Sequence, residues 1–75
     1  MAWKNEKVRQ LYIIADDSTL GTNVQLEAIK SLGVLAFDDD EAAYVLGEIA
    51  RTTTLGDIVR KAAAKELGRE RRNYI

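Results

Sequence analysis

The sequence predicts an all-α protein in which four short helices form two similar helix–turn–helix hairpins, packed as a compact bundle. Two observations support this fold class. Segments 18–33 and 53–68 lie 35 residues apart and are identical at eight of sixteen aligned positions. Apolar residues recur at helical spacing along four segments, and the 75 residues contain no proline. The predicted organisation is one domain, 1–75, with a first repeat at about 5–33, a second at about 39–68 and a basic tail at 69–75.

The first helix is expected within residues 1–15, with Asn5 as its N-cap. Ile13 and Ile14 widen its apolar face beyond one stripe, and a helix that is apolar on several sides packs on several sides. We therefore expect this helix to lie in the core, with a dimer seam on its second side as the alternative left open. The residues that share its main apolar face are Val8, Leu11, Tyr12 and Ala15.

The second helix is expected over about 20–32. Thr19 is its predicted N-cap, and Gly33 is predicted to stop it in a left-handed conformation. The apolar connector at 34–37 follows, and whether it forms a strand is left open.

The third helix is expected over about 39–51. Asp38 and Glu41 have the spacing of a capping box, so the acidic run is interpreted as a helix start rather than a metal site. Thr54 is the expected cap of the fourth helix, which ends at Gly68. Equivalent positions of the two repeats are predicted to fill the core, namely Leu11/Leu46, Ile14/Ile49, Val24/Val59, Ala28/Ala63 and Leu32/Leu67.

The composition argues against several classes of chemistry. The chain has no cysteine and no histidine, so no disulfide, thiolate metal site or imidazole base is available. Because neither a glycine-rich phosphate loop nor a nucleophile motif is present, we expect no enzymatic activity, no cofactor and no metal. A calcium loop starting at Asp16 fails because Leu20 stands where an oxygen ligand is required.

The small size of the chain favours self-association. A domain of this length buries only about 60% of the surface of its unfolded chain, so a single core gives marginal stability. A homodimer is therefore the expected state. No signal-peptide pattern and no apolar run of about 20 residues is present, so we expect a soluble, cytoplasmic protein without membrane contact.

Charge is distributed unevenly along the chain, although the formal net charge is only −1. Residues 1–56 carry five cations against nine acids, and residues 57–75 carry six cations against three acids. A basic C-terminal helix and tail of this kind is typical of a surface that binds phosphates. Our first hypothesis is a small, non-enzymatic, dimeric DNA-binding regulator. Its predicted nucleic-acid contacts are Arg60, Lys61, Lys65, Arg69, Arg71 and Arg72.

The alternative hypothesis is a helical protein–protein interaction or assembly module with no nucleic-acid role. Its candidate contacts are the aromatic residues Trp3, Tyr44 and Tyr74 and the acidic N-terminal side. The arrangement of the cations separates the two hypotheses. A shared solvent face favours the regulator, and cations that are scattered or paired with acids favour the interaction module.

Parts of the sequence resemble two known protein families. Residues 37–67 look somewhat like the two helices of a ribbon-helix-helix repressor, and the 35-residue period resembles that of tetratricopeptide-type repeats. The ribbon-helix-helix family requires a strand of alternating residues before its helices. The tetratricopeptide family requires the large, small and turn residues of its consensus. The chain has neither, so no residue roles are transferred from either family.

Overall fold

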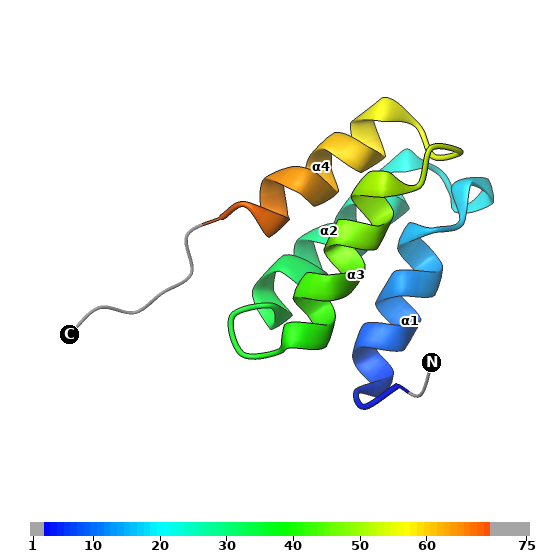
Figure 1. The fold of residues 1–75 in the computed structure, drawn as a ribbon. Helices are drawn as coiled ribbons and strands as arrows, with labels where there is room; N and C mark the ends of the chain where they lie inside the picture. Colours follow the sequence, from blue (N-terminus) through cyan, green and yellow to red (C-terminus); the bar gives the residue numbers. More distant parts are fainter. Residues whose placement is uncertain (1–2, 70–75) are drawn as a thin grey trace.

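The computed structural model describes residues 3–69 of the chain. These residues form four α-helices and one short 3-10 helix, joined by turns and loops (Figure 1). The all-α fold class is confirmed, and within those residues no strand forms. The 34–37 connector is instead the end of a helix followed by a turn. The elements are α1 (Glu6–Ala15), η1 (Ser18–Leu20), α2 (Thr22–Leu35), α3 (Asp40–Arg51) and α4 (Asp57–Leu67).

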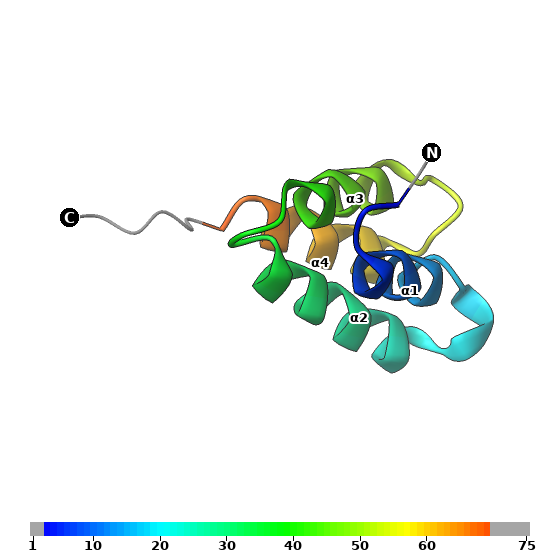
Figure 2. The same ribbon diagram turned by 90° about the horizontal axis from the view of Figure 1, so that it is seen from below.

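The helices share one hydrophobic core. α1 packs against α2 and α3 packs against α4, while α2 contacts each of the other three helices (Figures 1 and 2). The predicted amphipathic faces of all four helices contribute to this core. Its buried residues are Val8, Ala15, Ala28, Ile29, Leu32, Ala42, Val45, Leu46, Ile49, Leu55, Val59 and Ala63.

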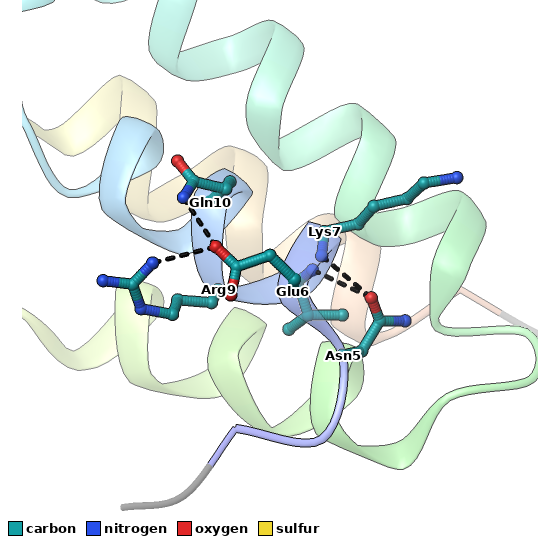
Figure 3. A network of polar contacts seen from close by, with 6 residues as sticks. Asn5, Glu6, Lys7, Arg9 and Gln10 are labelled. Carbon is teal, nitrogen blue, oxygen red and sulfur yellow. Dashed lines mark hydrogen bonds and ion pairs between the residues drawn. The ribbon is translucent and has the colours of Figure 1, made fainter.

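The first turns of α1 and α3 are capped by side-chain oxygens. The Asn5 side chain accepts hydrogen bonds from the backbone N–H groups of Lys7 and Val8, at 2.9 and 3.4 Å (Figure 3). The Asp39 side chain accepts hydrogen bonds from the backbone N–H groups of Glu41 and Ala42, at 2.8 and 3.3 Å. Both residues have extended backbone conformations, as N-caps do. The prediction for Asn5 is confirmed.

These two caps are also joined to each other. The Asn5 Nδ2 donates to Asp39 Oδ2 at 2.9 Å, and the Glu41 carboxylate accepts from the backbone N–H groups of Lys4 and Asn5, at 3.2 and 3.1 Å. The predicted capping box was therefore wrong by one residue, because the N-cap of α3 is Asp39 and not Asp38. Glu41 satisfies donors ahead of α1, a contact between segments that are distant in the sequence.

Gly33 does not stop α2, contrary to the prediction. It lies buried inside the helix, which continues to Leu35. The reason is a tertiary contact, because the Glu66 side chain of α4 lies where a Cβ atom at position 33 would be. Glycine is thus used for close helix approach rather than for a left-handed turn.

The start of α2 also differs from the prediction. Thr19 lies inside η1, where its backbone N–H donates to the Asp17 side chain at 3.0 Å. The helix begins after Gly21, whose φ of 96° lies in the region that favours glycine. The Gln25 side chain then fixes α2 to the end of α1 by donating to the Ala15 carbonyl at 2.9 Å.

The fourth helix begins later than predicted. Thr54 lies in a turn, Gly56 is the residue before the helix, and Leu55 is buried ahead of it. The predicted end is correct, because α4 finishes at Leu67 with Gly68 as its C-cap. Gly68 has a φ of −80°, so it ends the helix in a right-handed conformation rather than a left-handed one.

The two copies of the sequence repeat are used differently in the core. Both α2 and α4 begin directly after equivalent glycines, at positions 21 and 56. Val24, however, is 46% exposed while its counterpart Val59 is buried, and Leu32 is buried while Leu67 is 41% exposed. The core is thus not two-fold symmetric, and a structural repeat stays a prediction from the sequence.

The joined caps make stability depend on pH. The Asn5 side-chain hydrogen bond, together with the two backbone N–H donors, lowers the pKa of Asp39 below its ordinary value of 3.8. A carboxyl group with a lowered folded-state pKa stabilises the fold above its ordinary pKa, and this contribution is lost as pH falls through the folded value.

We therefore expect Asp39→Asn to reduce the loss of stability between about pH 5 and pH 2, because asparagine does not titrate. Its one side-chain oxygen still caps α3, but its NH2 group no longer accepts from Asn5 Nδ2. Asp39→Ala is expected to cost about 1 kcal/mol at neutral pH through loss of the cap. Urea unfolding across this pH range measures both effects. Asp38→Asn is the control, since it removes the same charge outside the cap. An equal response of the two Asn variants would contradict the assignment.

Candidate interaction surfaces

Arg60, the first of the predicted nucleic-acid contacts, is engaged within the protein. Its Nε donates to the Leu55 carbonyl at 3.0 Å, and its guanidinium forms an ion pair with Asp57. The side chain is 31% exposed. Arg60 therefore holds the turn before α4 against the first turn of that helix, and a phosphate contact would compete with this role.

The exposed side of α4 carries Lys61 and Lys65, which are four residues apart. Arg69 follows four residues later, beyond the end of the helix. The two lysines make no ion pair with any other residue of the 3–69 segment. Arg69 is paired with Glu66, through Nε–Oε1 and Nη2–Oε2 distances of 3.2 and 2.7 Å. The predicted contacts Arg71 and Arg72 lie outside the described residues.

A groove of about 350 Å³ runs between α2 and α4. We call it the α2–α4 groove. Lys30 enters it from α2 and Lys65 from α4, while the Glu66–Arg69 pair lies over Gly33. The apolar residues that line it are Leu26, Ile29, Val34, Phe37 and Ala62.

The sequence hypothesis missed Lys30 because it belongs to the acidic part of the chain. Lys30 and Lys65 occupy equivalent positions of the two sequence copies. The fold places them on adjoining helices around the same groove. The equivalence was visible in the sequence, but their proximity depends on how α2 packs against α4.

A second apolar surface lies on the other side of α2, along α1. Two adjoining hollows of about 570 and 200 Å³ share Leu11 and Ser31. We call this surface the α1–α2 groove. Val24 and Val34 are 46% and 65% exposed there. Its apolar lining residues are Leu11, Ile14, Val24, Ala28, Val34 and Leu35.

Charged residues stand at both ends of the α1–α2 groove. Glu6 and Lys7 border the end near the start of α1, and Glu27 borders the opposite end. The Glu6 carboxylate accepts hydrogen bonds from Gln10 and Arg9, at 2.7 and 2.9 Å (Figure 3). These contacts, the Gln10 one above all, lower the pKa of Glu6, so this carboxylate is ionised at neutral pH.

The aromatic residues suggested by the sequence lie in different settings. Trp3 packs against Tyr12, with ring centroids 5.7 Å apart, and is partly buried against the core. Tyr44 is 53% exposed on α3. Tyr74 lies outside the described residues. Of the two that the structure describes, Tyr44 is therefore the one more exposed to solvent.

Within residues 3–69, no group of three carboxylates is arranged to hold a metal ion. The acidic run at 38–41 instead supplies the α3 cap and the contact to the residues before α1. None of the described helices is long and apolar enough to cross a membrane. In comparisons with known proteins, no model of a protein family, no curated protein and no solved structure matches this chain.

The contact between Gly33 and Glu66 in the α2–α4 groove predicts coupling between these residues. Alanine is favoured over glycine inside a helix by about 1 kcal/mol, but a Cβ at position 33 has to displace the Glu66 carboxylate. Gly33→Ala is therefore expected to stabilise a Glu66→Ala background by about 1 kcal/mol and the wild-type protein by less. Urea unfolding of the four proteins in this double-mutant cycle gives the coupling energy. Additive effects would show that Glu66 does not occupy this position in solution.

Proposed function

We propose that this protein is a non-enzymatic helical interaction module that pairs with a second copy of itself through the α1–α2 groove. One observation carries the proposal, namely the contiguous apolar surface on which Val24 and Val34 are about half exposed or more. Contiguous apolar patches of this kind mark interaction sites in soluble proteins. The arrangement of the cations also favours an interaction module, because Arg60 and Arg69 are paired with acids.

The charges around the groove are complementary under two-fold symmetry. A two-fold axis that crosses the middle of the groove at right angles to its length brings each end of one copy against the opposite end of the other. Lys7 of one copy then lies near Glu27 of the second copy, twice over, while Glu6 at the same end is paired with Arg9 of its own copy. The apolar residues between these ends face each other across the axis. The groove thus has the self-complementary character that a symmetric dimer requires.

The size of the surface indicates a weak dimer. At 1.5 Å per residue, α1 is about 15 Å long and α2 about 21 Å. Two helices side by side are about 20 Å wide, so the surface covers roughly 400 Å² per copy. Stable specific interfaces bury about 800 Å² per partner. We therefore expect reversible association at micromolar or higher concentrations.

Sedimentation velocity between about 10 and 500 µM is expected to show the mass rising from monomer towards dimer. Val24→Glu is expected to keep the protein monomeric, because it places two carboxylates inside the apolar interface. Ile58→Glu on α4 is the matched control, since Ile58 is 65% exposed and lies away from the groove. A wild-type protein that stays monomeric over the whole range would refute the dimer.

Nucleic-acid binding is the second candidate function, supported by Lys61 and Lys65. These residues are exposed, one helical turn apart, and free of ion pairs within residues 3–69. They precede the tail that carries Arg71 and Arg72. A cationic strip of this kind contacts phosphates by releasing counterions, and binding then weakens steeply with salt.

For this second function we expect fluorescence anisotropy to detect binding to mixed-sequence duplex DNA at about 50 mM salt, with a large loss at about 200 mM. Lys61→Glu and Lys65→Glu are expected to weaken binding by similar factors, because each removes one phosphate contact. The control is Lys4→Glu, the same charge change at an exposed position far from α4. Absence of binding at low salt would exclude this function.

A further inference from the structure

We infer that the α2–α4 groove is a docking site for an acidic amphipathic helix of another protein. This inference rests on the proposed role as an interaction module and names a second partner class. It concerns a different surface from the α1–α2 groove. Only Val34, which lies on α2 between the two surfaces, belongs to both.

The shape of the groove suits a helix. Its lining on α2 runs from Leu26 to Val34, which is about 12 Å or a little over two helical turns, and Phe37 lies in the turn that follows. The opposite wall is α4 from Ala62 to Glu66, with Arg69 beyond the end of that helix. A third helix laid between two packed helices is a recurring mode of peptide recognition, in which the apolar face of the ligand enters the groove. This lining is spanned by a ligand helix segment of roughly 8 residues, the distance from i to i+7.

The floor of the groove is largely aliphatic. Leu26, Val34 and Ala62 contribute apolar surface, and Ile29 lies beneath them almost fully buried. Leucines spaced at i, i+3, i+4 and i+7 on a ligand would cover this surface. A nucleic acid would cover it poorly, because phosphates and sugars are polar and bases stack on aromatic faces. Phe37 is the one aromatic residue among the described residues that line the groove.

The charges select an acidic ligand. Glu66 is the acidic residue in the described lining, and its side chain is 14% exposed and paired with Arg69. Among the described lining residues this pair contributes no net charge, so Lys30 and Lys65 give that part of the lining its net positive charge. These two lysines come from the two opposite walls. Carboxylates on both flanks of a ligand helix would therefore each lie near a lysine. This arrangement favours an acidic partner and a defined position of its helix in the groove.

The test uses a fluorescein-labelled amphipathic peptide of roughly 15 residues, with leucines at the spacing above and glutamates on both flanks. Two control peptides accompany it. One carries lysine in place of every glutamate, and the other carries alanine in place of every leucine. We expect the acidic peptide to bind the full-length protein with a micromolar dissociation constant, and both controls to bind at least about tenfold more weakly.

Variants of the protein locate the binding site. Lys30→Glu combined with Lys65→Glu is expected to weaken peptide binding by about tenfold or more, because each substitution replaces an attraction to the peptide glutamates with a repulsion. Lys61→Glu is the control for a single charge reversal. It makes the same change on α4 outside the groove, and its effect on peptide binding is expected to be less than about twofold. Circular dichroism establishes that each variant is folded.

Several outcomes would overturn the inference. The first is no binding of the acidic peptide at about 500 µM, and the second is an equal effect of Lys61→Glu and the double variant on peptide binding. The third is binding of a single-stranded oligonucleotide that is tighter than that of the peptide and depends on Lys30 and Lys65.

The dimer is tested separately. Val24→Glu is expected to leave peptide binding intact, and the double variant is expected to leave the sedimentation mass unchanged. Failure of one proposal is thus distinguishable from failure of the other.

Discussion

The burial of α2 among the other three helices is the constraint on which the rest of the structure depends. Its face built from Ala28, Ile29, Leu32 and Gly33 is buried, and α2, like α3, contacts all three other helices. The helix is also the shared wall of both grooves, since Val34 borders the two. A change in how α2 packs would therefore move the core and both candidate surfaces together.

Polar contacts fix the ends of this arrangement where the core does not reach. Asn5, Asp39 and Glu41 join the starts of α1 and α3, and Gln25 joins α2 to the end of α1. The Glu41 and Gln25 contacts satisfy backbone groups at helix ends, namely the Asn5 N–H and the Ala15 carbonyl. In a domain this small, where apolar burial leaves little excess stability, such caps account for a substantial share of the total.

The charged residues serve structure as well as recognition. Arg60 and Arg69, both predicted as phosphate contacts, are paired with acids inside the protein, whereas Lys61 and Lys65 are exposed. The distribution of cations along the chain therefore overstates the cationic surface that α4 offers. The two surfaces flanking α2 differ in character. The α1–α2 groove is mostly apolar with both signs of charge at its ends, and the α2–α4 groove combines an apolar floor with two lysines that form no ion pair within residues 3–69.

The sequence by itself determined the number of helices, their amphipathic faces, the cap at Asn5 and most of the core, because these follow from local periodicity and capping chemistry. Only the tertiary structure decided that Gly33 lies inside a helix, that Val24 is exposed while Val59 is buried, and that Lys30 and Lys65 line the same groove. Each of these depends on which helix lies opposite. Residues 35 positions apart can share a sequence pattern and still face different neighbours, so their burial and their role are settled by packing.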